Sequence, residues 1–549
     1  MYKKLLVLLI LFFVKSTYAQ FVPSLITVDT AVTNNIKSKS FYVKNPVNRV
    51  IQITNIRTLS QQFTSNAAPF SINPFDSVLV TINFYTNQNI TYRDFFIFEN
   101  KGLNSPIVYY LVATAKYPDA LYSFTQGLID EPLKTALRTF TTTGYITLGY
   151  NTARDHMYGT IDHYESPDTL ECVYTGRRAY VKTRAQATAQ GFNCEHTYPQ
   201  GFFNSADPMV SDIFHLYPTD DAANNARGNY PFGLPITNIT YNVGGSKLGK
   251  DSQNETVFEP RDVHKGNVAR SLFYFSVKYA GNYGGFMTAK QEGILRQWNV
   301  FDTVDAKERL RNTRIKSFVN VFNPFIDHPE LVDRIKSTYS VIPAFNKPEI
   351  SASPNSVVFD TLAANDTASY YVAVMNYGTG NLSINSVTSS IPQFIVESVP
   401  SSVPQNELRY IKVKFKPSET SQTYNGVLSI QNPDSNITVN LRGFSNMQTG
   451  ITQISTILPE ELTLMQNFPN PFNPVTKIRF AVPYKLSGSY VTIRIYDLTG
   501  REIANPLSMN MNAGYYEMEF NGLNLASGVY LYRLQAGNYT EQKKLTLIK

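Results

Sequence analysis

Residues 193–200 read NCEHTYPQ and residues 212–229 read DIFHLYPTDDAANNARGN, and together they form the densest polar cluster of the chain. His is the side chain whose unperturbed pKa lies nearest neutrality, and the oxygens of Asp, Glu and Asn suit a hard cation such as Mg²⁺. A histidine base, a few oxygen ligands and one arginine are a reasonable set for cutting a phosphodiester. From these residues alone, a structural, hydrogen-bonded histidine remains the alternative.

The second stretch predicts the start of a helix. Thr219, Asp220 and Asp221 are residue types typical of a helix N-terminus. Asn224 lies one turn further on, and Arg227 follows three residues later, so the two side chains can face the same way.

The two stretches resemble the endonuclease I family of secreted and periplasmic nucleases. Further motifs of that family occur in order around this core, so the resemblance covers essentially all of residues 118–345. They are YTGR (174–177), FEPR (258–261), KGNVAR (265–270), LRQW (295–298), ERLRN (308–312) and NPFIDHPE (323–330).

The resemblance implies a ββα-metal finger, in which a β-hairpin and a helix hold one divalent cation. It assigns His196 as the general base that activates the attacking water, and Glu195 and Asn224 as metal ligands. Arg227 matches a basic residue of the family that contacts phosphate or supports the site. The implied cation is Mg²⁺, or another divalent cation such as Ca²⁺ or Mn²⁺, and the implied products carry 5′-phosphate ends.

Four further residues of this region have two interpretations each. Arg261 and Lys265 are candidates for backbone-phosphate contact, with a solvated basic surface as the alternative. Cys172 and Cys194 are the only cysteines of the chain. An oxidising compartment favours one disulfide between them, with a free buried pair as the alternative. With no other Cys, a zinc site is not expected.

One position departs from the family pattern. Related sequences commonly carry two His in the D-x-H-H-L-Y-P stretch, and here Phe214 replaces the first while His215 remains. The change concerns support around the site rather than the base or the metal ligands.

Residues 20–117 and 346–446 predict two β-rich modules. Val78, Val80, Ile82 and Phe84 recur with a period of two, which marks a half-buried strand. The later module repeats the pattern in residues 410–416, where apolar residues alternate with lysines. Both modules resemble immunoglobulin-like sandwiches appended to secreted bacterial enzymes, and neither carries a Cys for the antibody-type bridge.

Residues 447–463 predict a polar linker, and residues 464–549 resemble the C-terminal sorting domain of type IX secretion cargo. The motifs that carry this resemblance are NFPNPFNP (467–474), IYDLTGREI (495–503), SGVYLYRL (527–534) and the basic final strand KKLTLIK (543–549). A third immunoglobulin-like sandwich without an export role is the alternative.

Residues 1–19 predict a secretory signal peptide. Lys3 and Lys4 precede the apolar run Leu5 to Val14, and Ala19 ends a small-residue cleavage site. A membrane anchor is the alternative, although the apolar run is short for a membrane span and no later run predicts one.

Net charge does not identify the substrate. The chain of 549 residues carries a formal charge of +7, but residues 118–345 contain 23 Lys and Arg against 24 Asp and Glu. A nucleic-acid substrate must therefore be held by local backbone contacts rather than by a broad basic face.

The sequence thus predicts a multidomain protein, with an α+β ββα-metal finger nuclease domain flanked by all-β immunoglobulin-like sandwiches. The expected function is a secreted or surface-attached, metal-dependent endonuclease acting on DNA, RNA or both with low sequence specificity. The expected partners are the nucleic acid and the type IX secretion machinery. One alternative is a catalytically inactive surface interaction or adhesion protein, and another is an enzyme for a different phosphodiester.

Overall fold

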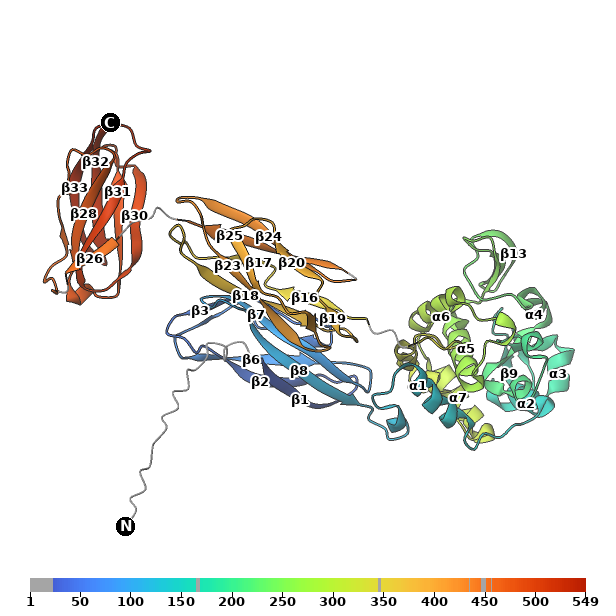
Figure 1. Ribbon diagram of the computed structural model, residues 1–549. Helices are drawn as coiled ribbons and strands as arrows, with labels where there is room; N and C mark the ends of the chain where they lie inside the picture. Colours follow the sequence, from blue (N-terminus) through green and yellow to red (C-terminus); the bar gives the residue numbers. More distant parts are fainter. Residues whose placement is uncertain (1–22, 164–167, 344–346, 434, 446–450, 456) are drawn as a thin grey trace, which may run out of the picture.

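The computed structural model describes residues 23–163, 168–343, 347–433, 435–445, 451–455 and 457–549. The predicted signal peptide lies outside the described residues. Figure 1 shows β-sheets in the first and last parts of the described chain and helices in the middle. Within the described ranges, the helices are all too short or too polar to cross a membrane.

The first part of the chain forms two facing sheets. The larger sheet has the strand order β1-β8-β7-β3-β5 and the smaller has the order β2-β6-β4, with β1 parallel to β8. Val80, Ile82 and Phe84 are buried in β6, as their period of two predicts. The strands are β1 (Ser24–Val32), β2 (Lys37–Lys44), β3 (Ile51–Arg57), β4 (Phe63–Thr64), β5 (Ser71–Ile72), β6 (Ser77–Phe84), β7 (Thr91–Lys101) and β8 (Ile107–Lys116).

A second pair of sheets follows the helical part. Its sheets have the orders β16-β18-β23-β21 and β17-β25-β24-β20, and a short β19-β22 pair lies outside them. Ile411, Val413 and Phe415 of β23 are buried on one face, while the lysines between them alternate to the other. The strands are β16 (Ile350–Ser353), β17 (Ser356–Val358), β18 (Ala368–Asn376), β19 (Leu382–Ser383), β20 (Ser386–Ser389), β21 (Phe394–Ser398), β22 (Ser402–Val403), β23 (Leu408–Phe415), β24 (Thr423–Gln431) and β25 (Asn436–Phe444).

These two sandwiches pack against each other, as Figure 1 shows. Alternation along β7 sends Phe96 and Phe98 into the first core and Phe95 and Ile97 to the opposite face. There, Phe95, Ile97 and Val108 form a separate apolar cluster with Ala373, Met375 and Leu408 of the second sandwich. The interface also contains the hydrogen bonds Arg57 Nη2 to Ala352 O (3.0 Å), Ser353 Oγ to Glu99 Oε1 (2.9 Å) and Tyr371 N to Asn104 O (2.7 Å).

The helical middle part is inserted between the two sandwiches and has one core of its own. Its longest helix, α5 (Lys265–Tyr279), is buried on nearly all sides. The other helices are α1 (Asp130–Thr142), α2 (Tyr150–His156), α3 (Arg184–Ala189), α4 (Asp221–Arg227), α6 (Ala289–Phe301), α7 (Ala306–Val319) and α8 (Pro324–Asp327). Short strands complete it: β9 (Thr169–Glu171), β10 (Arg178–Tyr180), β11 (Phe192–His196), β12 (Leu216–Asp220), β13 (Thr237–Val243), β14 (Ser246–Lys250) and β15 (Thr256–Glu259).

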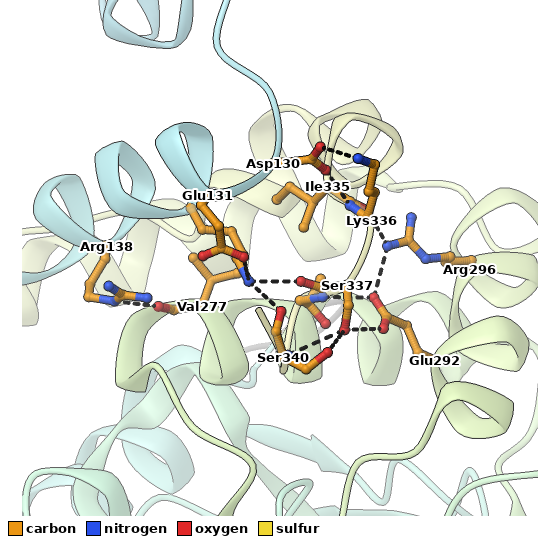
Figure 2. Close-up of polar contacts among 12 residues, drawn as sticks. Asp130, Glu131, Arg138, Val277, Glu292, Arg296, Ile335, Lys336, Ser337 and Ser340 are labelled. Atoms are coloured by element: carbon orange, nitrogen blue, oxygen red, sulfur yellow. Dashed lines mark hydrogen bonds and ion pairs between the residues drawn. The ribbon is translucent and has the colours of Figure 1, made fainter. Parts of the chain in front are cut away.

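The two ends of this middle part are tied together. Lys134 of α1 donates from Nζ to the carbonyl oxygens of Ser337 (3.0 Å) and Ser340 (2.7 Å). Glu292 of α6 accepts from the backbone N–H of Thr338 (2.9 Å) and from Ser337 Oγ (3.0 Å), and Figure 2 shows these contacts gathered around Ser337. The chain therefore enters and leaves the middle part at one place.

The last part again consists of two sheets, with the orders β26-β31-β28-β27 and β30-β29-β32-β33. The predicted linker over 447–463 is in part wrong, because β26 (Ile451–Ser455) lies within it and pairs antiparallel with β31. The other strands are β27 (Thr463–Leu464), β28 (Val475–Val482), β29 (Ser489–Tyr496), β30 (Glu502–Met511), β31 (Gly514–Asn521), β32 (Gly528–Ala536) and β33 (Tyr539–Leu547).

Phe95→Ala should weaken the interface between the two sandwiches. Phe95 is 1% exposed and its ring lies 5.4 Å from that of Tyr110, so its truncation should lower the free energy of unfolding of the sandwiches by ~3–5 kcal/mol. Thermal unfolding followed by far-UV circular dichroism measures the loss. Leu79→Ala, at a side chain 56% exposed on β6, is the matched control. Equal melting of the two variants would contradict the docked arrangement.

Candidate active site

The polar stretches 193–200 and 212–229 belong to a hairpin followed by a helix. β11 pairs antiparallel with β12, which places Glu195 opposite Tyr217 and His196 opposite Leu216. α4 begins at the residue after β12, and the N–H of Asp221 donates to the carbonyl of Gly191 (3.1 Å). Gly228 ends the helix with a φ of 51°, in the region that favours glycine. The local order is therefore two antiparallel strands and a helix.

Glu195 is buried between the hairpin and the helix. It is 2% exposed, its Oε1 accepts from the Tyr174 hydroxyl (2.7 Å), and the same oxygen lies 2.9 Å from Arg227 Nε. Burial raises the pKa of Glu195, while the Arg227 guanidinium and the Tyr174 hydroxyl act against that rise. No described residue donates a hydrogen bond to Oε2, and this oxygen is not fully buried.

Arg227 supports Glu195 from inside the protein. The residue is fully buried, and its Nη atoms donate to the carbonyl oxygens of Thr197 (3.0 Å), Gly228 (3.0 Å) and Tyr230 (2.7 Å). Its guanidinium carbon lies 4.4 Å from the ring centre of Phe232. Of the two expectations for Arg227, the geometry favours support of the site, because nothing outside can touch a fully buried guanidinium.

His196 is the last residue of β11 and directly follows Glu195. Its ring contacts α2 rather than Arg227 and lies 5.4 Å from the ring of Tyr150. Nε2 lies 3.2 Å from the carbonyl oxygen of Val210. Because a carbonyl only accepts, Nε2 carries the proton and Nδ1 has a lone pair. Nδ1 has no partner among the described residues and is not fully buried.

The imidazole of His196 is held neutral. Burial and the neighbouring His215 ring lower the pKa of His196 to about 3. His215 is held in the same way, since its Nε2 lies 2.7 Å from the carbonyl of Met209 and burial lowers its pKa to about 4. One short segment, Met209–Ser211, therefore orients both rings through backbone carbonyls.

Asn224 lies on α4 one turn before Arg227 and is half-buried. Its side-chain amide has no hydrogen-bond partner among the described residues and is not fully buried. The Oε2 of Glu195 and the amide oxygen of Asn224 are hard donors of the kind that Mg²⁺ takes together with several waters. Among the described residues there is no group of three or more His, Cys, Asp or Glu side chains that could hold a metal ion.

Arg261 and Lys265 are already paired with carboxylates. Arg261 Nη1 donates to Glu171 Oε1 (2.9 Å), and Lys265 Nζ donates to Glu259 Oε1 and Asp262 Oδ1 (both 2.7 Å). Arg261 and His264 line a cavity of about 50 Å³ on this side of the domain, which does not include Glu195, His196 or Asn224. A phosphate bound here would have to compete with these acids.

The disulfide expectation is corrected, because both cysteines are free and buried. The Sγ of Cys172 lies 3.6 Å from Thr219 Oγ1, on the face of the hairpin that Asn193 and Thr219 share. Cys194 follows Asn193 on β11, so its side chain points to the opposite face of the hairpin from Asn193 and Cys172. There, burial raises the pKa of its thiol to about 12.

Tyr174 and Asp212 support the site although no role was expected for either from the sequence. Tyr174 lies in the YTGR motif, and its hydroxyl holds Glu195. Asp212 accepts from Lys278 Nζ (2.8 Å) and from the hydroxyls of Tyr274 (3.0 Å) and Tyr279 (2.7 Å). Both residues lie in motifs that carry the family resemblance, and this was the only sequence signal that pointed to them. Phe214, where the family resemblance implied a His, packs in the core against Tyr274 with ring centres 4.7 Å apart.

Residues 131–330 match the family model described as Endonuclease I, and residues 466–549 match the model described as Secretion system C-terminal sorting domain. The extracellular ribonuclease of Bacillus amyloliquefaciens is 33% identical over 236 residues, which are 40% of this chain and 78% of that protein. Its counterpart in Bacillus subtilis (strain 168) is 32% identical with the same coverage. Endonuclease-1 of Buchnera aphidicola is 26% identical over 135 residues, 24% of this chain and 51% of that protein.

Arg227→Met should destabilise the middle part by ~3–5 kcal/mol, because it leaves the buried Glu195 carboxylate without its cation and three carbonyls without donors. Trp298 is the only tryptophan of the chain and is 4% exposed on α6, so its fluorescence during urea unfolding reports this part alone. Arg178→Met, at a half-exposed ion pair, is the control and should change stability by less than ~1 kcal/mol. Equal stability of the two variants would argue against the supporting role.

Acid should destabilise the middle part through His264. Burial and four nearby cations hold the pKa of this buried imidazole well below 6.5, so below about pH 6.5 the unfolded state binds a proton that the folded state does not. The free energy of unfolding should therefore fall with decreasing pH. His264→Phe removes this group, and between pH 6 and pH 5 the slope measured by Trp298 fluorescence should decrease by ~1.4 kcal/mol per pH unit. An unchanged slope would show that His264 is protonated in the folded protein.

Proposed function

The chain belongs to the endonuclease I family, and we propose that it is a metal-dependent endonuclease that cleaves DNA, RNA or both with low sequence specificity. As a member of this family it is a hydrolytic nuclease with a nucleic-acid substrate. Its sorting tail and its extracellular relatives make it a secreted or cell-surface protein that leaves through the type IX system.

One observation carries the proposal. Three polar atoms, Nδ1 of His196, Oε2 of Glu195 and the side-chain oxygen of Asn224, have no partner among the described residues and are not fully buried. His196 and Glu195 are held in place by their other contacts, and Asn224 belongs to the helix α4 that packs on the hairpin. Unpaired polar atoms at a site built this firmly are what a substrate and a cation with its waters would satisfy.

In the proposed mechanism, His196 Nδ1 accepts a proton from the attacking water, and the backbone carbonyl of Val210 keeps Nε2 protonated and the ring in place. The water oxygen forms a bond to phosphorus, and the bond to the 3′ oxygen breaks. The 3′ oxygen takes a proton from solvent, so the products are a 5′-phosphate and a 3′-hydroxyl. A bound divalent cation would stabilise charge on the phosphate and on the departing oxygen.

Glu195 and Asn224 would hold the cation. Members of this family generally use divalent metal ions. The ion pair with Arg227 uses Oε1 of Glu195 and counteracts the rise in the pKa of this carboxyl that burial causes, which leaves Oε2 as the candidate ligand. Mg²⁺, or another divalent cation such as Ca²⁺ or Mn²⁺, suits one carboxylate and one amide oxygen.

The division of the chain is part of the proposal. We assign residues 118–345 as a ββα-metal nuclease domain, 20–117 and 346–446 as immunoglobulin-like sandwiches, and 464–549 as the sorting domain. Supporting this, the described strands of the flanking parts form facing sheets, and the middle part has a core of its own. The alternative function, an inactive surface interaction protein, is less favoured because Glu195, His196 and Asn224 are all present.

His196→Ala should lower the rate of nucleic-acid cleavage by ~10²–10⁴-fold, because the variant lacks the base that takes the proton from water. The assay is plasmid nicking and digestion of single-stranded RNA by the mature chain with Mg²⁺, with EDTA in parallel to abolish cleavage. A folded, metal-binding protein that cuts neither polymer would favour the surface-interaction alternative. Cleavage of cyclic or lipid phosphodiesters alone would assign a different substrate.

Asn224→Ala should raise the Mg²⁺ concentration for half-maximal cleavage by at least ~10-fold, since even residues that only orient a ligand change metal affinity by ~10–100-fold. Asn225→Ala is the matched control, because Asn225 is the exposed neighbour of Asn224 on α4. Titration calorimetry with Mg²⁺ measures the affinity without relying on activity. The same Mg²⁺ affinity in both variants would exclude Asn224 as a ligand.

A further inference from the structure

A second arginine lies on the His196 side of the hairpin. Arg154 belongs to α2, and its guanidinium carbon lies 4.2 Å from the ring centre of Tyr150. The same Tyr150 ring lies 5.4 Å from the His196 ring. Arg154, Tyr150 and His196 are therefore consecutive neighbours from α2 to the end of β11.

Arg154 has no acidic partner. Its side-chain hydrogen bond is from Nη2 to the neutral Asn151 Oδ1 (2.7 Å), and no carboxylate of the described residues lies within ion-pair distance of it. Its Nε is buried without a hydrogen-bond acceptor. A buried N–H without a partner is unfavourable, and a guanidinium without a counter-ion attracts an anion.

Arg184, which also contacts Asn151, differs from Arg154 in having a carboxylate partner. Arg184, at the start of α3, also donates to Asn151 Oδ1, but its Nε lies 3.2 Å from the Asp155 carboxylate. The other arginines discussed for this domain, Arg227 and Arg261, are likewise paired with glutamates. Arg154 thus combines proximity to the candidate base with an uncompensated charge.

We propose that Arg154 is a substrate-binding residue that contacts a phosphate oxygen of the nucleic-acid backbone next to the bond on which His196 acts. The assignment rests on the proposed function and adds a residue to its site. Arg154 is only half-buried, and Asn151 is its one hydrogen-bond acceptor among the described residues, so its Nη groups can donate to phosphate oxygens. The contact is to the backbone, so it holds the strand in place without reading its sequence.

The position of Arg154 also suits a domain with no excess of basic residues. The guanidinium stays oriented by the Tyr150 ring and by Asn151, so little side-chain freedom is lost when phosphate binds. A purely structural role, bracing Tyr150, would need only these two contacts and would leave the affinity for nucleic acid unchanged.

The test measures binding without cleavage. The parent protein is the full mature chain with His196→Ala, in EDTA, and the probes are fluorescent 12-nucleotide DNA and RNA single strands followed by anisotropy. Arg154→Gln should raise Kd by ~10–100-fold, as expected for a charge-assisted hydrogen bond. It should also reduce the slope of log K against log salt by ~0.7, the value for one phosphate contact on a single strand. Arg154→Lys should keep most of the salt slope and lose part of the affinity.

Arg184→Gln is the matched control, because Arg184 shares Asn151 but has its own carboxylate, and its Kd and salt slope should stay those of the parent. Urea unfolding followed by Trp298 fluorescence verifies that each variant is folded. If Arg154→Gln does not fold, the comparison is made with Arg154→Lys. If the parent binds nucleic acid and the folded Arg154 variants bind it with the same Kd, the assignment of Arg154 is wrong while the proposed function is unaffected. A parent that binds neither strand would instead overturn the proposed function, and the assignment with it.

Discussion

The carboxylate of Glu195 and the guanidinium of Arg227 meet inside the protein, where either charge alone would be strongly unfavourable. This pair joins the last turn of α4 to β11, and the hydrogen bond of Arg227 to the carbonyl of Thr197 extends the connection beyond the strand. The hairpin and the helix consequently cannot move apart without separating two buried charges. The same constraint determines which oxygen of Glu195 remains available, and it places Asn224, one turn earlier on α4, beside the hairpin.

The rest of the molecule keeps this arrangement in a defined frame. The sandwiches before and after the middle part share a small apolar core that includes Phe95 and Met375, so their relative position is fixed by packing. The contacts of Lys134 and Glu292 with Ser337 bring the entry and the exit of the middle part together (Figure 2). A domain inserted at a single place can hold its own core while its neighbours pack directly on each other.

Local patterns were sufficient for much of this structure. Alternation predicted strands such as β6, and the residue types Thr219, Asp220 and Asp221 predicted the start of α4. The polar composition of 447–463 gave no sign of β26, because an edge strand is specified by its partner β31 rather than by its own residues. The partner of Arg261 is Glu171, 90 positions away, and no local pattern contains such a pairing. The expected disulfide is absent for a geometric reason. Cys172 lies on the face of the hairpin that Asn193 and Thr219 share, and Cys194, adjacent to Asn193, points to the opposite face.

Charge compensation explains how a domain with nearly equal numbers of acids and bases can act on a polyanion. Cations paired with carboxylates, such as Arg261 and Lys265, contribute little field beyond their partners. Attraction for phosphate then depends on individual groups whose charge is not cancelled and which are partly shielded from water. Arg154 meets both conditions beside His196. Recognition concentrated at the bond to be cut, rather than spread over a basic face, agrees with an enzyme that accepts many sequences because its contacts are to the backbone alone.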